Sequence, residues 1–315
     1  MEAMDRKAVA RETLHILQQG YYDAPIKAKG GTKAGEQEKK RVSIADDMKW
    51  SVSHSILITP QESSRLLETY EAEVEAAFGE NPGEAGAMAD KKADRQSQTV
   101  DMGSQVENIS TVDAIRMLFA EGKEKIGVLN FASAKNPGGG FLNGAMAQEE
   151  SLAASSALYE TLTANEEYYR VNRANRSMMY TDYGIYSPNV TFFRDGRFCL
   201  TQEPVKASVL TMPAVNMGQV LLKGEDMEEA KRVMRRRMKL TLAIFASQGA
   251  KNLVLGAYGC GVFRNDPLQV AVWWKEILEE GFDRYFESVI YAVLDRSRDQ
   301  TCIRAFQKVF LGEGE

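Results

Sequence analysis

Two adjacent carboxyl side chains, Glu149 and Glu150, lie shortly after three consecutive glycines, Gly138 to Gly140. Cleavage of a glycosidic bond needs a carboxyl group that protonates the leaving oxygen, and sugar hydroxyls need hydrogen-bond acceptors. The two glutamates can supply both functions. The competing interpretation is a solvated first helical turn, where acidic side chains are favoured electrostatically.

The glycines follow an apolar segment, Ile126 to Phe131, that is typical of a buried strand. Glycine leaves the backbone uncovered, so a ligand can approach main-chain amides closely and a positive φ carries little cost. Loops that follow strands are also where α/β proteins usually bind ligands. An isolated glycine triplet would indicate only a flexible turn, so its position before the two glutamates carries the argument.

A second glycine-rich loop follows another strand candidate, Leu253 to Leu255. The amides of Gly259 to Phe263 could wrap a diphosphate as an anion nest, and Phe263 or Tyr258 could contact a ribose or a base. Asp266 and Pro267 then fit the N-cap and the first position of a helix. The loop matches neither a Walker A motif nor the G-x-G-x-x-G dinucleotide pattern. Two such loops in one domain favour a diphosphate ligand.

Strands and helices alternate from about residue 99 onward, which indicates an α/β fold with a mixed sheet flanked by helices. The expected strands are 105–108, 126–131, 184–186, 190–193, 208–211, 253–255 and 289–294, and the expected helices are 111–121, 148–163, 226–247, 267–280 and 300–310. Residues 1–98 are expected to form a mainly helical accessory region, with helices at 6–19 and 61–78 and a mobile loop over about 79–98. The main domain then covers 99–315.

The net charge of −5 opposes broad binding to a polyanion, so an anionic ligand needs a focused site, and we expect no direct recognition of a nucleic-acid sequence. A basic run in the long helix is best interpreted as a solvated face; it consists of Lys231, Arg232, Arg235, Arg236, Arg237 and Lys239. No long apolar segment predicts a membrane span or a targeting signal, which favours a cytoplasmic protein, or a nuclear one if the source is eukaryotic.

Metal and thiol chemistry is not indicated by the remaining reactive side chains. Cys199, Cys260 and Cys302 are widely spaced and odd in number, which predicts neither a disulfide framework nor a zinc cluster. Only His15 and His54 could serve a histidine-based metal site or a Ser-His-Asp triad, and both lie outside the motifs. We expect no metal and no cofactor.

Three segments together resemble the microbial-type poly(ADP-ribose) glycohydrolases of the macrodomain superfamily. NFASAKNPGGGFLNGAMAQEESLAASSALY (130–159) resembles the family signature, in which GGG is followed after a short spacer by QEE. LGAYGCGVFRND (255–266) resembles its second, diphosphate-binding loop, and YTDYGIYSPNVTFFRD (180–195) resembles the intervening strands. The resemblance spans roughly 105–295 and implies a macrodomain-like fold preceded by a helical extension.

The resemblance implies a role for each matching residue. Glu150 would be the catalytic acid and then the base, and Glu149 would bind hydroxyls of the riboses that flank the bond. Asn136 would orient the distal ribose, and Phe263 would press on the terminal ribose. The complete set implied to bind ADP-ribose is Asn136, Gly138, Gly139, Gly140, Phe141, Gln148, Gly259, Cys260, Gly261, Val262 and Phe263.

The implied reaction is hydrolysis of ribose-to-ribose O-glycosidic bonds in poly(ADP-ribose), free or on a modified protein, with release of ADP-ribose and a role in reversing ADP-ribosylation after DNA damage. A helix N-terminus favours the carboxylate form of Glu150, so burial beneath the bound polymer must favour its protonated form. Three alternatives stay open here: a mono-ADP-ribosyl hydrolase, a non-catalytic ADP-ribose reader and a metabolic nucleotide-sugar enzyme. Attack at the chain end or inside the polymer also stays open.

Overall fold

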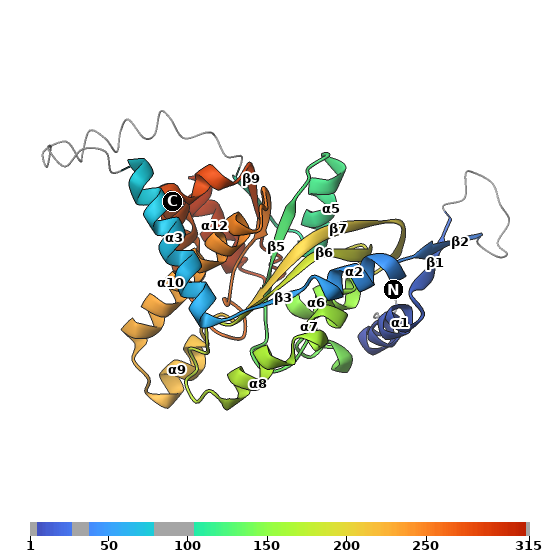
Figure 1. The fold of residues 1–315 in the computed structure, drawn as a ribbon, viewed down its shortest axis with the longest axis horizontal. Coiled ribbons are helices and arrows are strands. Elements are labelled where there is room, and N and C mark those ends of the chain that lie inside the picture. The colour runs from blue at the N-terminus through green and yellow to red at the C-terminus, as the bar shows by residue number, and fades with distance from the viewer. Residues whose placement is uncertain (1–4, 27–37, 79–103, 313–315) are drawn as a thin grey trace, which may run out of the picture.

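A computed structural model describes residues 5–26, 38–78 and 104–312. Its centre is a seven-stranded sheet in the order β3-β6-β7-β5-β8-β9-β4, with helices on both faces, and a two-stranded β1-β2 sheet lies to one side (Figure 1). The predicted fold class, a macrodomain-like mixed sheet flanked by helices, is confirmed. The N-terminal elements are α1 (Arg6–Gln19), β1 (Tyr21–Pro25), β2 (Lys39–Ser43), α2 (Ala45–Ser53), β3 (Ile56–Ile58) and α3 (Pro60–Phe78).

The remaining elements alternate along the chain as expected. The strands are β4 (Ser104–Glu107), β5 (Ile126–Phe131), β6 (Gly184–Arg194), β7 (Leu200–Met212), β8 (Asn252–Leu255) and β9 (Ser288–Ala292). The helices are α5 (Thr111–Ala120), η1 (Phe141–Asn143), α6 (Gln148–Ser155), α7 (Leu158–Ala164), α8 (Glu166–Ala174), α9 (Met217–Lys223), α10 (Met227–Ser247), α11 (Pro267–Ile277), η2 (Leu278–Phe282), η3 (Asp283–Tyr285) and α12 (Thr301–Phe310).

Strand direction decides where the loops meet. Strands β7, β5, β8, β9 and β4 run parallel to one another, and β6 is antiparallel to the strands on both of its sides, β3 and β7. The carboxyl ends of β7, β5 and β8 therefore lie at one edge of the sheet, side by side. The two glycine-rich loops, which follow β5 and β8, emerge as neighbours at this edge.

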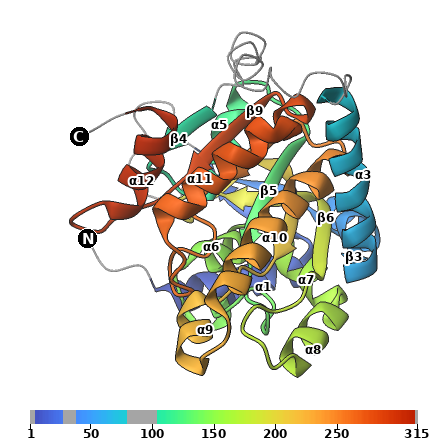
Figure 2. The same ribbon diagram turned by 90° about the vertical axis from the view of Figure 1, so that its left-hand side faces the viewer.

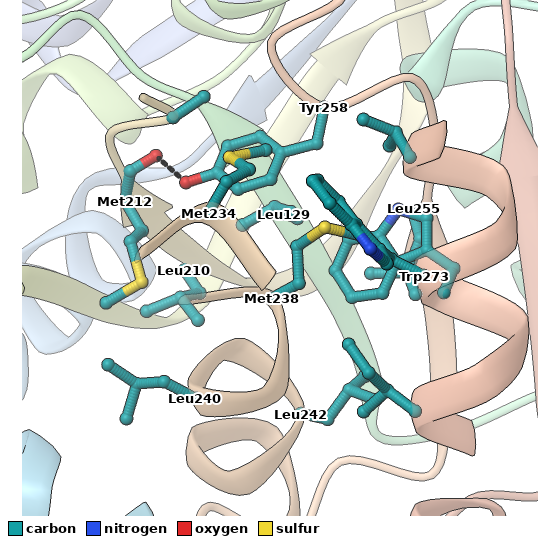
Figure 3. Close-up of a cluster of buried hydrophobic side chains, with 14 of the residues drawn as sticks. Leu129, Leu210, Met212, Met234, Met238, Leu240, Leu242, Leu255, Tyr258 and Trp273 are labelled. Atoms are coloured by element: carbon teal, nitrogen blue, oxygen red, sulfur yellow. Dashed lines mark hydrogen bonds between the residues drawn. The ribbon is translucent and has the colours of Figure 1, made fainter. Parts of the chain in front are cut away.

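Buried apolar side chains hold the sheet between its two helical layers. Along β5, Val128 faces one apolar cluster and Leu129 the other, because successive side chains of a strand point to opposite faces. Helices α10 and α11 cover the Leu129 face, where Met238 and Trp273 pack (Figures 2 and 3). Helices α5 and α7 cover the other face. Full cover on both faces explains why β5 and β8 are apolar apart from one asparagine each, Asn130 and Asn252.

The accessory region contributes directly to the central sheet. Strand β3 pairs with β6 at the sheet edge, with Ile56 opposite Tyr186, and α3 packs along α10. The helices predicted in this region are confirmed, whereas the predicted loop over 79–98 lies outside the described residues. The boundary near residue 99 stays a prediction, although the sheet itself extends across it.

The structure divides one predicted helix and joins two predicted strands. The helix expected over 148–163 is divided into α6 and α7, because Ser156 forms a β-bridge with Phe192 and the amide of Ala157 donates to Thr191 O at 3.0 Å. The short strands expected at 184–186 and 190–193 form one long strand, β6, with a register shift between Ser187 and Val190. Both differences depend on partners that are distant in sequence.

The prediction of a solvated basic face on α10 is wrong for Arg237. Its side chain is 1% exposed; it donates to Asp182 Oδ1 at 3.0 Å, Met179 O at 2.7 Å and Pro213 O at 3.0 Å. Burial of a charged group is tolerated here because an opposite charge and two carbonyls replace water.

No helix in the described part of the chain is long and apolar enough to cross a membrane.

Candidate active site

The side chain of Gln148 fixes the start of α6 to the end of β5. Its Oε1 accepts from the amide of Phe131 at 2.9 Å, and its Nε2 donates to Leu129 O at 2.8 Å and Thr111 Oγ1 at 3.3 Å. Both polar atoms of the Gln148 side chain thus have hydrogen-bond partners within the protein. Gln148 therefore positions the two glutamates that follow it, whereas the ADP-ribose contact expected for it stays a prediction.

The carboxyl group of Glu149 is buried beneath the loop that follows β5, and its side chain is 3% exposed. Its Oε2 accepts from the amide of Ser133 at 2.6 Å, and its Oε1 from Asn130 Nδ2 at 3.4 Å. Burial raises the pKa of Glu149 to about 8, against the opposing effect of the Ser133 amide. Near pH 7 this carboxyl group is therefore mostly protonated in the free protein.

Glu150 is held by one carboxyl oxygen and keeps the other unused. Its Oε1 accepts from the amide of Gly140 at 2.8 Å. Its Oε2 is buried and has no hydrogen-bond partner among the described residues. A buried carboxyl oxygen without a partner costs free energy, which singles out such an atom as a candidate for contact with a substrate or a water molecule.

Gly139 is required by the two carboxyl groups that face it. Its φ is +59°, and a Cβ atom there would collide with Glu150 Oε1 and lie 3.0 Å from Glu149 Oε2. The amides of two of the three glycines are already in use, because Gly139 donates to Asn136 O and Gly140 donates to Glu150. The diphosphate contact expected for these glycines therefore stays a prediction, because the protein's own acceptors occupy two of their amides.

The other predicted residues of this first loop (132–147) lie on different sides of it. The ring of Phe141 is 2% exposed and packs edge-on against Tyr159, so the side chain belongs to the core. The amide of Phe141 donates to Gly138 O at 3.2 Å. Asn136 is exposed, and its amide donates to Ser133 Oγ at 3.1 Å. Of the two, only the side chain of Asn136 can reach a ligand.

The second loop (256–266) is anchored by neutral groups. Tyr258 is fully buried and donates through its hydroxyl group to Met212 O at 2.9 Å, as the dashed line in Figure 3 marks, so the base or ribose contact considered for it is excluded. Asn265 Nδ2 donates to Val215 O at 2.8 Å and to Gly259 O at 3.0 Å. Tyr258 attaches this loop to the last residue of β7, and Asn265 attaches it to the segment that follows β7.

The tip of the second loop keeps its amides available. The backbone N–H groups of Gly259, Gly261, Val262 and Phe263 donate to no other residue in the described ranges. The side chain of Val262 is 85% exposed, whereas the ring of Phe263 lies 6.0 Å from that of Tyr180, measured between centroids. Successive unpaired amides at a positive-φ turn are the elements of an anion nest.

Several residues that position the site were not found from the sequence. Asn130 and Thr211 contact each other beneath Glu149, with Asn130 Nδ2 donating to Thr211 Oγ1 at 3.1 Å. Arg237 joins the segment of Met179 and Tyr180 to that of Pro213. A single asparagine in an otherwise apolar strand was the available signal for Asn130; nothing near Arg237 in the sequence indicated its partner Asp182.

No group of three or more histidine, cysteine, aspartate or glutamate side chains within the described ranges could hold a metal ion.

Comparison with known proteins agrees with this geometry. Residues 10–195 match the profile of the microbial-type PARG catalytic domain, where PARG stands for poly(ADP-ribose) glycohydrolase. The chain belongs to this family. The family predicted from the glycine and glutamate motif is thus confirmed, and so is the prediction of an enzyme. The alternatives of a non-catalytic reader and of a metabolic nucleotide-sugar enzyme lose their support.

Solved structures of bacterial PARGs are similar over nearly the whole chain. The enzyme from Thermomonospora curvata, solved bound to the inhibitor ADP-HPD, is 36% identical; the alignment covers 97% of this chain and 99% of that one, with a TM-score of 0.79. The enzyme from Deinococcus radiodurans, solved in complex with ADP-ribose, is 36% identical; the alignment covers 84% of this chain and 97% of that one, with a TM-score of 0.71. A search among curated proteins finds no match.

Proposed function

We propose that this PARG hydrolyses the ribose-to-ribose O-glycosidic bond of poly(ADP-ribose) with Glu150 as the single acid and base, releasing ADP-ribose. The observation that carries the proposal is the unequal use of the two oxygens of Glu150. Oε1 is fixed by Gly140 at 2.8 Å, while the buried Oε2 has no partner among the described residues. A leaving oxygen or a water molecule next to Oε2 would satisfy it.

The reaction needs two proton transfers at the same atom. Protonated Glu150 donates its proton to the departing ribose oxygen while the glycosidic bond breaks and positive charge develops on the sugar carbon. The resulting carboxylate then takes a proton from a water molecule that attacks this carbon. The products are two free hydroxyl groups, and Glu150 regains its proton.

Glu149 supports this cycle through its own protonation state. With a pKa of about 8, raised by burial, it is mostly neutral near pH 7, so Glu150 has no second full negative charge beside it. A neutral carboxyl group can also donate a hydrogen bond, which suits a ribose hydroxyl. Positioning of the water molecule falls either to Glu149 or to a phosphate of the ligand.

The ligand is proposed to lie between the two glycine-rich loops. The unpaired amides of the second loop, those of Gly259 and of Gly261 to Phe263, are suited to the diphosphate, and the exposed Asn136 is suited to the distal ribose. Support also comes from the relatives solved with ADP-ribose and with ADP-HPD. Poly(ADP-ribose), free or attached to protein, is the proposed partner.

The decisive experiment compares release of ADP-ribose from poly(ADP-ribosyl)ated protein by the wild type and by Glu150→Gln. We expect kcat to fall by roughly 10²–10⁴-fold, the usual contribution of a general acid–base group, while ADP-ribose binding measured by calorimetry persists. Glu166→Gln is the matched control, because Glu166 also lies in the first turn of a helix but is exposed.

Three outcomes would contradict the proposal. Full activity of Glu150→Gln would exclude Glu150 as the acid and base. Binding without turnover by the wild type would exclude hydrolysis. Release of single ADP-ribosyl groups from modified side chains, with the polymer left intact, would assign the mono-ADP-ribosyl hydrolase activity instead.

A further inference from the structure

We propose that Thr13, in the N-terminal helix α1, is a positioning residue that holds Glu150 in its reactive geometry; the proposal rests on the proposed function of Glu150. Thr13 lies 137 positions before Glu150 (150 − 13), in the region predicted to be accessory. Its side chain is fully buried, and its hydroxyl group donates to Ala154 O at 2.7 Å. Ala154 belongs to α6, the helix that begins with Gln148, Glu149 and Glu150.

The partner of this hydroxyl group sets Thr13 apart from three other helical threonines. Thr69, Thr163 and Thr241 each donate to the carbonyl oxygen four residues earlier in their own helix. That local bond is ordinary for a threonine inside a helix. Thr13 donates instead to a different helix, 141 positions away in the sequence. A buried hydroxyl group therefore connects α1 to α6, where a local bond would have satisfied it equally well.

Helix α6 depends on side chains from outside its own turns at both ends. It has only eight residues, its N-cap residue makes no side-chain capping hydrogen bond, and its last four carbonyls have no partner within the helix. Gln148 connects the first turn to β5. At the other end, Ser156 Oγ donates to Leu152 O at 2.7 Å, and Thr13 donates to Ala154 O. Loss of the Thr13 hydroxyl group would deprive a buried carbonyl of its donor, a cost that a shift of this short helix would reduce.

The same helix also contacts the first loop, which holds the other side of the reacting carboxyl group. Helix α1 lies beside α6 and η1 (Figure 1). Ala10 packs in one apolar cluster with Phe141 of the loop and Ala153 of α6. Both partners of the hydrogen bond between Glu150 Oε1 and the amide of Gly140 therefore rest on α1. A change in how α1 meets α6 would alter this bond.

A buried ion pair attaches α1 to the sheet independently of Thr13. The side chain of Arg194, the last residue of β6, is 3% exposed; its Nη2 donates to Glu12 Oε2 at 2.6 Å and its Nη1 to Phe198 O at 2.9 Å. A buried guanidinium group needs an opposite charge, so this pair keeps α1 in place. Removal of the Thr13 hydroxyl group alone thus leaves α1 attached and changes only its connection to α6.

The consequence concerns the chemical step rather than binding. A misplacement of about 1 Å at a reacting group can lower a rate by about 100-fold. The second loop, which is proposed to bind the diphosphate, is anchored instead by Tyr258 and Asn265. We therefore expect loss of the Thr13 hydroxyl group to lower kcat and to leave the Kd for ADP-ribose nearly unchanged.

The test compares the wild type with Thr13→Val, Thr13→Ser and Ser51→Ala. Valine keeps the shape of threonine without the donor, whereas serine keeps the hydroxyl group. Ser51→Ala is the matched control, because Ser51 is also buried in the N-terminal region and donates to a main-domain carbonyl, Pro188 O in β6, at 2.6 Å. We expect Thr13→Val to release ADP-ribose from the polymer with a kcat about tenfold lower. Its Kd by calorimetry, and the kcat of the other two variants, should stay within about twofold of the wild type.

Hydrogen exchange followed by mass spectrometry gives a readout that a general loss of stability would not move. The amides of Ser133 and Gly140 donate to the two carboxyl groups, so a peptide that covers both should exchange faster in Thr13→Val than in Ser51→Ala. The proposal is overturned if Thr13→Val keeps the wild-type kcat, if its exchange matches that of Ser51→Ala, or if Thr13→Ser loses as much activity. Full activity of Glu150→Gln contradicts the proposed function alone, because the exchange result still decides whether Thr13 positions the carboxyl groups.

Discussion

The two glycine-rich loops follow adjacent parallel strands, yet they use their amides in opposite ways. In the first loop the amides of Ser133 and Gly140 donate to carboxyl groups of α6. In the second loop the amides from Gly261 to Phe263 donate to no other described residue, and neutral anchors hold the loop from below. The amides of the first loop thus bind the protein's own carboxyl groups, whereas the amides of the second loop are available for the phosphate groups of a ligand.

The difference separates chemistry from binding. Anchoring by Glu149 and Glu150 fixes the geometry of the reacting carboxyl group, and burial sets the protonation state of its neighbour. Anchoring by Asn265 and Tyr258 adds no ionisable group that titrates near neutral pH, so the second loop can meet a diphosphate without a competing negative charge. Four predictions test this comparison, from the largest expected effect to the smallest.

Glu149→Gln should change how stability depends on pH. The folded-state pKa of Glu149 is about 8, above the ordinary value of 4.5, so the folded protein holds a proton that the unfolded chain loses. The wild type therefore has this contribution in full below about pH 4.5 and loses it as the pH rises to 8. A shift of one pKa unit corresponds to about 1.4 kcal/mol. The free energy of unfolding of Glu149→Gln should therefore rise by several kcal/mol relative to that of the wild type between pH 4.5 and pH 8.

Chemical unfolding at pH 5, 6, 7 and 8 measures this effect, with the exposed Glu166→Gln as the control that should follow the wild type. The glutamine is compatible with the site, because it has the size of glutamate and its carbonyl oxygen can accept from the amide of Ser133, as Glu149 Oε2 does. Parallel pH profiles for Glu149→Gln and the wild type would mean that Glu149 is charged in the folded protein, and the contrast between the two loops would then need another origin.

Gly139→Ala should disable the first loop, whereas Gly261→Ala should leave the second loop intact. The added methyl group at Gly139 would push against both carboxyl groups at a φ of +59°, while the one at Gly261 meets nothing within 4 Å. We expect kcat/KM to fall about 100-fold for Gly139→Ala, or about 2.7 kcal/mol, and less than about twofold for Gly261→Ala. Equal effects in a polymer-release assay would contradict the distinction.

Asn265→Ala should weaken binding more than it slows the chemical step. The substitution leaves Val215 O and Gly259 O without the Nδ2 donor, at a cost of about 1–3 kcal/mol for buried groups. The Kd for ADP-ribose should rise about tenfold, which corresponds to about 1.4 kcal/mol, while kcat at saturating polymer changes much less. A fall in kcat with an unchanged Kd would place Asn265 with the catalytic loop instead.

Val262→Ser should have the smallest effect. The side chain is 85% exposed and the proposed contact is through the backbone amide, so stability should change by less than about 0.5 kcal/mol. Calorimetry should give a Kd for ADP-ribose within about twofold of the wild type. A tenfold change would indicate that the side chain itself covers the ligand.

Sequence patterns correctly predicted the helices and strands that are determined by residues adjacent in the sequence. Strand β5 has the residues expected for it, and the start of α6 follows from the spacing between Gly140 and Gln148. The break between α6 and α7 could not be predicted, since it depends on Thr191 and Phe192 of β6. Likewise, the unpaired oxygen of Glu150 and the raised pKa of Glu149 arise from burial under the folded loop. The spacing of residues in the sequence does not indicate this burial.

Burial of Arg237 shows the same limit in a charged run. Its neighbours on α10 contact carboxylates at the surface, as Lys231 does with Glu228 and Arg232 with Glu229. Arg236 and Arg237 both pair with Asp182, which precedes β6, but only the side chain of Arg237 is buried there. The six basic residues are close together in the sequence but differ in burial. The face of the helix on which each residue lies, and the partner it meets there, determine whether it is buried.

Strand β3 has a consequence for how the chain can be shortened or can fold. Its pairing with β6 joins residues 130 positions apart, Ile56 and Tyr186, so the sheet edge closes only after most of the chain has been made. A fragment that began at residue 99 would leave the β6 edge open, with unpaired N–H and C=O groups that recruit other chains. The region before the catalytic motifs thus acts as an edge protector against aggregation, and it cannot be removed as an appendage.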